Sequence, residues 1–144
     1  MLGLIQRVSQ AEVRVDGETT GAIGKGLLLL LGIQKTDTTQ TVEKLLNKIV
    51  NYRVFGDDMG HMNLSLIDVQ GQLLIVSQFT LAADTRKGLR PSFSSSAPPD
   101  MAEALYDEFV AAAGALVPVQ TGVFGADMKV SLLNDGPVTF MLDA

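Results

Sequence analysis

The sequence predicts a single α/β domain in which two amphipathic helices pack on a β-sheet. A chain of 144 residues with 47% hydrophobic content is long enough for one well-filled core and too short for two. Short runs of aliphatic and β-branched residues alternate with two stretches of helical period. The longest apolar run, residues 27–31, is far below the roughly 20 residues that a membrane helix needs. We therefore expect residues 1–144 to form one soluble, untargeted domain without a membrane segment.

Strands and tight turns are expected in the first third of the chain. Residues 2–15 are rich in apolar side chains and alternate at their end, as a half-buried strand does. Asp16-Gly17 follows at once and is typical of a two-residue hairpin, because both turn positions need φ > 0. Residues 27–33 form a leucine-rich run. A buried helix could have the same composition, but the shortness of the run and its flanking glycines favour a central strand.

The clearest helical period lies in residues 37–52. Five apolar side chains recur there at the i, i+3, i+4, i+7 and i+8 spacing of one helix face: Val42, Leu45, Leu46, Ile49 and Val50. Asp37 is expected to cap this helix, with Gln40 in the position of a capping-box partner. Two shorter strands, at residues 54–55 and 64–69, are expected around a turn at residues 56–61.

The turn at residues 56–61 holds the side chains that most resemble a metal or acid/base site. Asp57 and Asp58 are adjacent, but neighbouring carboxylates in a turn are usually solvated. His61 is the only histidine, and the sequence reveals no partner that would make it a general base. We therefore expect neither a metal site nor a cofactor.

Residues 72–80, QLLIVSQFT, are the stretch around which the rest of the chain is organised. Residues 73–76 have the composition of a strand buried on both faces, and the run ends in the polar segment Ser77, Gln78, Phe79 and Thr80. The chain has no cysteine, so Cys-His systems are absent and Ser-His-Asp systems are poorly supported. A hydrolytic site here must rely on hydroxyls, backbone amides or the substrate itself. The absence of cysteine also fits a cytosolic protein.

Residues 82–97 form a long connection without periodicity, which in a compact domain is usually functional or disordered. Arg86, Lys87 and Arg90 cluster in it beside Phe93 and a run of serines. Such a set suits phosphate binding or base stacking, and a flexible solvated loop is about as plausible from this stretch alone. The net charge of −5 argues against a broad nucleic-acid-binding surface, although it permits a local basic patch. The position of the loop directly after Thr80 favours a function.

The last third of the chain predicts a second helix and three strands. Pro98-Pro99-Asp100 suits a helix start and Gly114 a helix stop. The expected buried face of this helix comprises Met101, Leu105, Phe109 and Ala112 or Ala113. Strands are expected at residues 116–122, 128–133 and 138–142, with a tight turn at residues 134–137. If the Gly136-Pro137 bond in that turn were cis, two neighbouring carbonyl oxygens would point the same way and could bind an ammonium group.

Four segments together closely resemble the D-aminoacyl-tRNA deacylases: LIQRVSQAEVRVDGE at residues 4–18, SQFTLAAD at 77–84, RPSFS at 90–94 and NDGPVTF at 134–140. The resemblance runs along essentially the whole chain. It implies a compact α/β domain with a barrel-like, mixed or antiparallel sheet and two helices, working as a homodimer. It also implies hydrolysis of the ester that joins a D-amino acid, or achiral glycine, to the 3′-terminal adenosine of tRNA in the cytoplasm.

The resemblance carries over to individual positions. Ser77, Gln78, Phe79 and Thr80 match the family's SQFT motif, which implies a catalytic site there. Gly136 and Pro137 match its Gly-cisPro motif, which in the family is inserted from one subunit into the pocket of the other. Carbonyl oxygens of that turn would bind the α-ammonium group and exclude an L side chain. For the tRNA acceptor end we expect contacts from the basic side chains Arg86, Lys87, Arg90 and Lys129.

Two catalytic routes and two rival functions stay open. Thr80 could be a nucleophile, but it has no adjacent base. We favour assistance by the ribose 2′-hydroxyl, with the Phe79 and Thr80 amides stabilising the oxyanion. A non-catalytic RNA-binding module and an esterase for small D-amino acid derivatives are the alternative functions.

Overall fold

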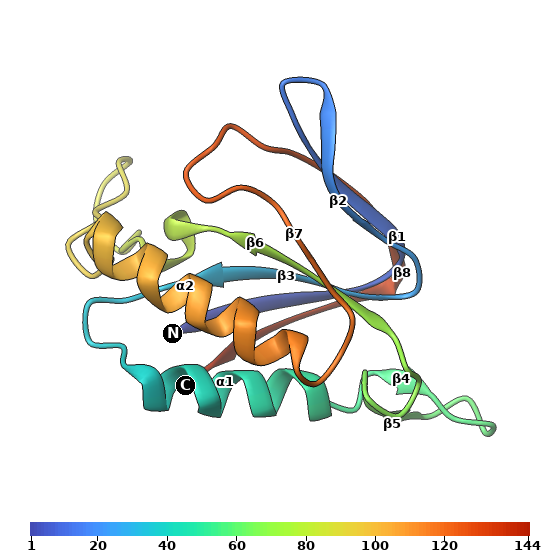
Figure 1. Ribbon diagram of the computed structural model, residues 1–144. Coiled ribbons are helices and arrows are strands. Elements are labelled where there is room, and N and C mark those ends of the chain that lie inside the picture. The colour runs from blue at the N-terminus through green and yellow to red at the C-terminus, as the bar shows by residue number, and fades with distance from the viewer.

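The computed structural model describes all residues, 1–144, and six of its strands form one strongly curved sheet (Figure 1). The strands are β1 (Leu2–Val15), β2 (Glu18–Ile23), β3 (Gly26–Gly32), β6 (Gln72–Ser77), β7 (Val119–Thr121) and β8 (Lys129–Asp143). Their order is β2-β1-β3-β6-β7, and β8 pairs with β1. All pairs that involve β1 are antiparallel, whereas β3-β6 and β6-β7 are parallel. The predicted mixed sheet is confirmed.

The long strand β1 is what curls this sheet. Its first half pairs with β3 and its second half with β2, while β8 follows it along almost its whole length. The far end of the sheet then comes back to β2, because the Thr20 hydroxyl donates to the Thr121 carbonyl oxygen of β7 (3.4 Å). Gly21 lies against the same segment, and a Cβ at this position would collide with the Thr121 backbone. The result is a nearly closed barrel.

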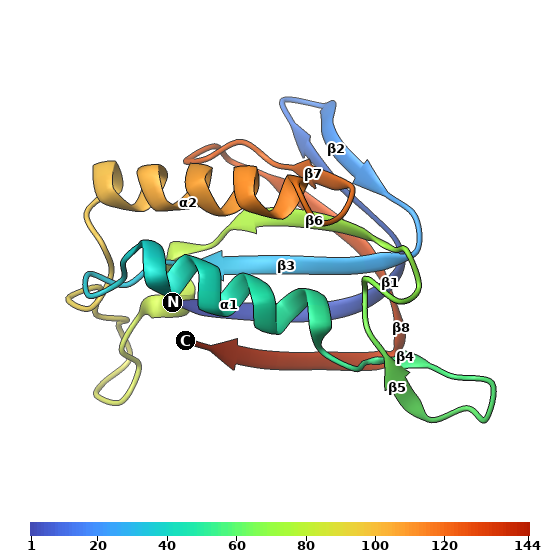
Figure 2. The ribbon, with the colours of Figure 1, turned by 60° about the horizontal axis from the view of Figure 1, so that its bottom comes forward.

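Both helices lie on the same outer face of the barrel (Figure 2). Helix α1 (Thr39–Asn51) buries the five apolar side chains that its period predicted. Helix α2 (Pro99–Gly114) buries Phe109 and Ala113 as predicted, but Met101 and Leu105 are only half-buried and Tyr106 takes the central place. The Tyr106 hydroxyl donates to the Ile75 carbonyl oxygen (3.2 Å), which satisfies its polar end inside the core. Neither helix has the length and apolar character needed to cross a membrane.

The core has two parts, one on each side of the sheet. The larger part joins the outer face of the sheet to the helices, and the smaller part fills the barrel interior. Successive residues of β3 alternate between them: Leu27 and Leu29 face the helices, and Leu28 faces the interior. Strand β6 does the same with Leu73 and Leu74. Burial on both faces of the sheet therefore explains the continuous aliphatic runs in the sequence, as predicted.

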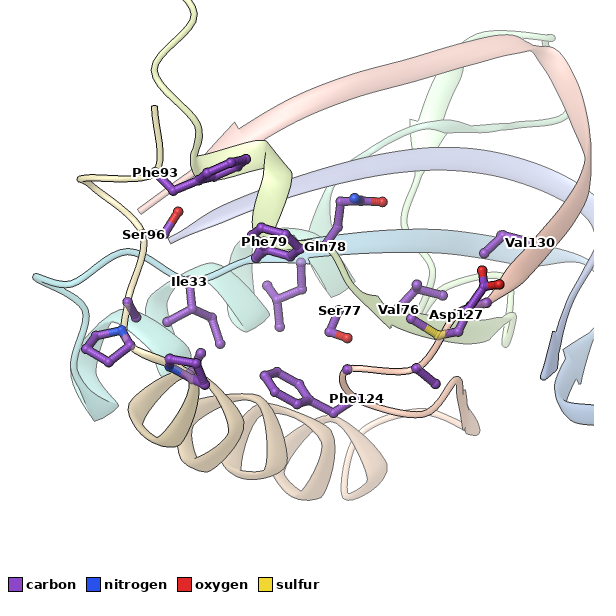
Figure 3. Close-up of a pocket in the computed structure, with 18 residues that line it drawn as sticks. Ile33, Val76, Ser77, Gln78, Phe79, Phe93, Ser96, Phe124, Asp127 and Val130 are labelled. Atoms are coloured by element: carbon purple, nitrogen blue, oxygen red, sulfur yellow. The ribbon is translucent and has the colours of Figure 1, made fainter. Parts of the chain in front are cut away.

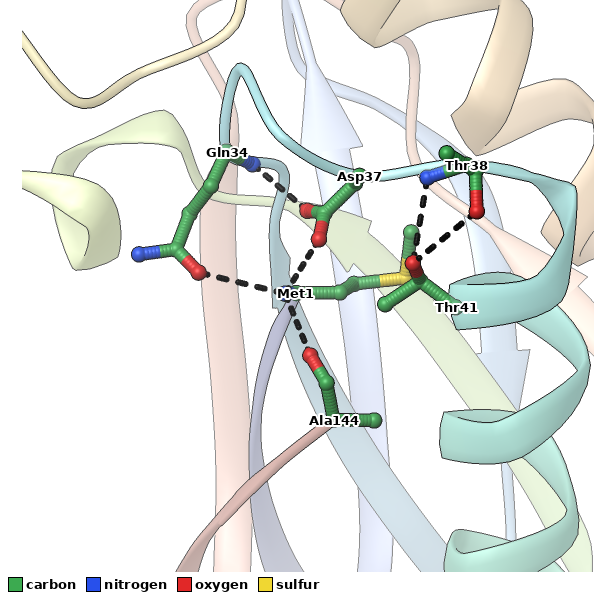
Figure 4. A network of polar contacts seen from close by, with 6 residues as sticks. All are labelled: Met1, Gln34, Asp37, Thr38, Thr41 and Ala144. Atoms are coloured by element: carbon green, nitrogen blue, oxygen red, sulfur yellow. Dashed lines mark hydrogen bonds and ion pairs between the residues drawn. The ribbon is translucent and has the colours of Figure 1, made fainter.

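A buried polar network joins both ends of the chain to the loop before α1 (Figure 4). The Met1 amino group donates to Asp37 Oδ1 (2.6 Å), to Gln34 Oε1 (3.2 Å) and to the Ala144 carbonyl oxygen (2.9 Å). The backbone N–H of Gln34 donates to the second oxygen of Asp37 (2.7 Å). Asp37 is buried, so this pairing compensates for the removal of its charge from water.

The network corrects the predicted start of α1. Asp37 does not cap the helix, because both of its oxygens are taken by Met1 and Gln34. Thr38 is the N-cap residue instead, and its backbone N–H donates to Thr41 Oγ1 (3.1 Å). Thr41, not Gln40, is therefore the capping-box partner.

The strand predicted at residues 64–69 is wrong. Strand β5 (Met62–Leu64) pairs with β4 (Phe55–Gly56) in a small hairpin, and a turn follows it directly. The Ser65 N–H donates to Asp68 Oδ2 (2.9 Å), and the Asp68 N–H donates to Ser65 Oγ (3.1 Å). These local hydrogen bonds compete with strand pairing and favour a turn. In the preceding turn, Asp57 Oδ1 accepts the Met59 and His61 N–H groups, and the His61 side chain is exposed.

The C-terminal strands also differ from the prediction. Strand β7 has three residues instead of the seven expected at residues 116–122. The two strands predicted at 128–133 and 138–142 are one strand, β8, interrupted by a bulge at the expected turn. Both halves of β8 pair with β1, and the register shifts between Gln6 and Val8. Since β1 is long enough to pair with both halves, the turn chemistry produces a bulge and not a reversal of the chain.

Candidate active site at the end of strand β6

A cavity of about 680 Å³ lies where β3 and β6 end (Figure 3). Its walls come from four segments: the ends of β3 and β6, the loop before α2, the first turns of α2, and residues 124–130. Most of the lining side chains are hydrophobic, among them Ile33, Phe93 and Phe124. A mainly apolar cavity of this size with a few polar groups is typical of a small-molecule or cofactor site.

The predicted segment Ser77–Thr80 borders this cavity, although it does not continue the strand. Strand β6 ends at Ser77, and Phe79–Ala82 form a 3₁₀ turn, η1. The Gln78 N–H donates to the Leu31 carbonyl oxygen (2.8 Å), which ties the segment to β3. The backbone N–H groups of Phe79 and Thr80 are the first two of this turn, and neither donates to a loop carbonyl or to a side chain. The first N–H groups of a helical turn lack partners within it, so these two donors are available to a bound group.

The Thr80 side chain is exposed and does not line the cavity. Its hydroxyl accepts a hydrogen bond from Gln78 Nε2. No histidine or carboxylate hydrogen-bonds to it, and His61 lies in the turn between β4 and β5. The surroundings of Thr80 therefore contain no base that would activate its alcohol.

Two aromatic rings flank the cavity. The ring centroids of Phe79 and Phe93 are 5.2 Å apart, with the ring planes inclined by 48°. Both rings are partly open to solvent, with 62% of Phe79 and 41% of Phe93 exposed. Phe93 belongs to the loop between η1 and α2, and it directly follows a segment that is closed by backbone hydrogen bonds between Asp84 and Ser92. The long connection expected at residues 82–97 thus contains a closed segment at 84–92, and the cavity is lined by residues that follow this segment, from Phe93 on.

The four predicted basic residues fall into two classes. Arg86 forms a bidentate ion pair with Asp84 (2.9 and 2.7 Å), and Lys129 pairs with Asp127 (3.1 Å). The hydrogen bonds from Arg86 hold the pKa of the Asp84 carboxyl well below its usual range. Lys87 and Arg90 are exposed and make no ion pair in the chain. They are the more accessible cations of this loop.

The Gly136-Pro137 turn is the bulge of β8, and its peptide bond is cis. The turn is exposed, and the Asn134 side chain holds it by hydrogen bonds to the Val138 backbone. Asn134 Oδ1 accepts the Val138 N–H (2.8 Å), and Asn134 Nδ2 donates to the Val138 carbonyl oxygen (3.3 Å). Gly136 is required here, because a Cβ would lie 2.5 Å from the Val138 nitrogen.

Arg7 holds the same turn from the neighbouring strand, a role that sequence analysis missed. Its Nε donates to the Asp135 carbonyl oxygen (2.8 Å), and its Nη1 donates to the Val54 carbonyl oxygen (2.6 Å). The side chain is only 17% exposed. The one signal in the sequence was that Arg7 is the only charged residue among the first ten, in a strand rich in apolar side chains.

The turn does not reach the cavity of its own chain. In the strand register, Asn134 of β8 pairs with Val8 of β1, and Val8 pairs with Gly26 of β3. Gly26 in turn pairs with Gln72 at the start of β6. The cavity lies at the other end of β6, five residues further on and three strands across. With about 3.3 Å per residue and about 4.8 Å per strand, the separation is on the order of 20 Å. The structure therefore brings Ser77, Gln78 and Phe79 to the cavity, leaves the Thr80 side chain beside it, and leaves Gly136 and Pro137 outside it.

Comparisons with known proteins assign the chain to one family. The family model of D-Tyr-tRNA(Tyr) deacylase matches residues 4–143. The chain is 60% identical over 143 residues to the D-aminoacyl-tRNA deacylase of Haemophilus influenzae (strain PittEE), with 99% of each chain covered. It is 64% identical over 140 residues to that of Saccharophagus degradans, covering 96% of this chain and 97% of the relative.

Two solved structures share the fold. One is described as "c-Myc DNA Unwinding Element Binding Protein"; it has a TM-score of 0.95 and 42% identity, and the match covers 100% of this chain and 99% of that one. The other is described as a probable eukaryotic D-amino acid tRNA deacylase, with a TM-score of 0.88 and 18% identity over 99% of this chain and 98% of that one. At 18% identity the second likeness concerns the fold alone.

Proposed function

The chain belongs to the D-Tyr-tRNA(Tyr) deacylase family, and from this premise we propose how its residues select and hydrolyse a D-aminoacyl-tRNA. Its activity is that of a D-aminoacyl-tRNA deacylase, a hydrolase acting on the ester bond between a D-amino acid and tRNA. The observation that carries the proposed mechanism is the pair of free N–H groups at Phe79 and Thr80, beside an apolar cavity. In the proposal the cavity receives the 3′-terminal adenosine, and the ester carbonyl lies against these amides.

The amides of Phe79 and Thr80 stabilise the negative charge that develops on the ester oxygen during attack. Loss of one such donor typically costs on the order of 10² to 10³ in rate. The ribose 2′-hydroxyl, adjacent to the ester, assists the attack. The Thr80 hydroxyl has no base and accepts from Gln78, so its role is to position the segment and not to act as the nucleophile. Ser77 and Gln78 complete the cavity wall on this side.

Chiral selection is assigned to Gly136 and Pro137 of a second copy of the chain. The turn is exposed and lies on the order of 20 Å from its own cavity, so it can act only in the cavity of a partner. Four large apolar side chains of β8 near the turn are exposed and suit a homodimer contact: Leu132, Leu133, Phe140 and Met141. Carbonyl oxygens of the turn bind the α-ammonium group and exclude an L side chain. Glycine has no side chain to exclude and is accepted.

Contact with the tRNA acceptor end is assigned chiefly to Lys87 and Arg90. Arg86 and Lys129 contribute less, because each already pairs with a neighbouring carboxylate. Few phosphates are therefore neutralised, and all tRNAs are accepted through their shared 3′ end. The cytoplasm, where aminoacyl-tRNAs are consumed, is the proposed place of action.

One experiment separates this function from its rivals. Purified protein is incubated with matched D- and L-aminoacyl-tRNA, glycyl-tRNA and free D-aminoacyl esters. Release from D-aminoacyl-tRNA and glycyl-tRNA, but not from the L form or the free esters, supports the proposal. Release from the free esters at a comparable rate indicates an esterase of small D-amino acid derivatives. No release from any substrate leaves a non-catalytic RNA-binding module.

A further inference from the structure

The Ser96 hydroxyl is the one buried side-chain oxygen or nitrogen in this chain without a hydrogen-bond partner. Ser96 lines the cavity at the end of β6, on the side of Phe93 and Ile33 (Figure 3). Buried polar groups in folded proteins are almost always hydrogen-bonded, and an exception calls for a physical reason. A missing ligand is one such reason. The oxygen is closed to a water-sized probe while the cavity is empty, so a ligand supplies the partner only when a neighbouring wall side chain shifts slightly.

The backbone around Ser96 is fixed, so the hydroxyl has little freedom to find a partner elsewhere in the chain. The Ser96 N–H donates to the Phe93 carbonyl oxygen (3.1 Å), and the Ala97 N–H donates to the Ile33 carbonyl oxygen (3.0 Å). On the other side, Ser95 Oγ donates to the Ala82 carbonyl oxygen (2.6 Å). Residues 95–97 are thus anchored to η1, to the loop itself and to the residue that follows β3.

The surroundings of the hydroxyl are apolar. Ala97, Pro98, Pro99 and Ala102 form the wall beside it, and aromatic rings form two further sides of the cavity. Flat rings bind well between such walls, but apolar walls do not distinguish one flat ring from another. A single fixed hydroxyl can do so, since it offers one donor and two acceptor sites at a defined place.

We propose that the Ser96 hydroxyl hydrogen-bonds an edge of the 3′-terminal adenine and is a specificity-determining residue of this deacylase. The inference rests on the proposed function, in which the adenosine bearing the ester occupies the cavity next to Phe79 and Thr80. Adenine presents ring nitrogens as acceptors and its 6-amino group as a donor, and the hydroxyl can rotate to pair with either kind of group.

The test combines a side-chain deletion with deletions of single atoms from the base. Ser96→Ala is compared with wild type and with Ser94→Ala, an exposed serine of the same loop. The substrates are D-aminoacyl-tRNAs that end in adenosine, purine riboside, 1-deaza-, 3-deaza- or 7-deaza-adenosine. Together these analogues remove each hydrogen-bonding atom of the base in turn.

With the adenosine-ended substrate, Ser96→Ala is expected to raise KM about tenfold while kcat changes less than twofold, and Ser94→Ala to match wild type. With one of the analogues, wild type and Ser96→Ala should become equal. A separate melting measurement should give Ser96→Ala a Tm equal to or above that of wild type, because no internal hydrogen bond is lost.

An effect of Ser96→Ala that persists at full size with every analogue would overturn the proposal, as would a Tm several degrees below wild type. These results differ from a failure of the proposed function itself. In that case the wild-type protein would release no D-amino acid from the adenosine-ended substrate.

Discussion

Replacement of Arg7 by methionine should weaken the chiral filter more than it weakens the fold. The side chain is mostly buried, and methionine keeps much of its apolar stem while removing the guanidinium group. The hydrogen bonds to the Asp135 carbonyl oxygen (2.8 Å) and to the Val54 carbonyl oxygen (2.6 Å) are lost, and the first of these is the side-chain link between β1 and the turn. A hydrogen bond to a charged group contributes about 1.5 to 3 kcal/mol. The ion pair with the exposed Asp135 carboxylate, at 3.8 Å, adds little.

That free energy corresponds to a change of about 10- to 150-fold in the population of the correctly placed turn. The assay is the ratio of kcat/KM for D- and L-aminoacyl-tRNA. We expect this ratio to fall by about tenfold or more in Arg7→Met, and the D-specific activity to fall with it. Arg53→Met, which removes an exposed arginine whose one side-chain hydrogen bond is to Asn63, is the matched control and should retain the wild-type ratio. An unchanged D/L ratio in a variant with a lowered Tm would show that Arg7 supports the fold alone, and the reasoning would be refuted.

Three further predictions concern the nucleophile, the tRNA contact and the buried network. Thr80→Ala should retain measurable single-turnover deacylation, whereas tRNA ending in 2′-deoxyadenosine should react far more slowly with the wild-type enzyme. An inactive Thr80→Ala enzyme that still binds substrate would return the nucleophile role to Thr80. The slope of log K against log[salt] for tRNA binding should be shallow, about −2 to −3, because few cations are free, and a slope near −6 would contradict the placement of Lys87 and Arg90. Asp37→Asn should lower the free energy of unfolding by about 3 kcal/mol in denaturant titrations, because it leaves the buried Met1 amino group without its charge partner. A loss below about 1 kcal/mol would mean that the ion pair adds little.

Local sequence patterns correctly predicted the strands, helix and turn that depend only on neighbouring residues. The leucine run of β3 and the aliphatic run of β6 are buried on both faces, and the period of α1 places its five apolar residues in the core. The hairpin at Asp16-Gly17 was predicted from its turn chemistry, and both residues have positive φ.

Features that depend on distant partners could not be predicted in this way. Arg7 holds a turn 128 positions away along the chain, and Asp37 is recruited by an amino group 36 positions away. The bulge at Gly136 was mistaken for a boundary between strands, since only the length of β1 makes β8 continuous.

Residues of the cavity show the same limit. The polar end of β6 identified one wall, because a buried strand that turns polar is visible in the sequence. In the sequence, Ser96 is only one member of a serine run. Its lack of a hydrogen-bond partner depends on how the bonds to Phe93 and Ile33 hold the backbone, which no local pattern reveals.

Mixing two inactive variants tests most directly whether a turn from one protomer completes the cavity of the other. Gly136→Ala distorts the turn, and Phe79→Pro removes an amide donor. Proline is tolerated at position 79 because the preceding residue, Gln78, does not have helical backbone angles. The two proteins are denatured together, refolded and assayed for release of a D-amino acid from tRNA. Action between protomers predicts recovery of about a quarter of wild-type activity, since about half of the dimers are mixed and each has one intact site. Activity no higher than that of the separate variants would contradict the account.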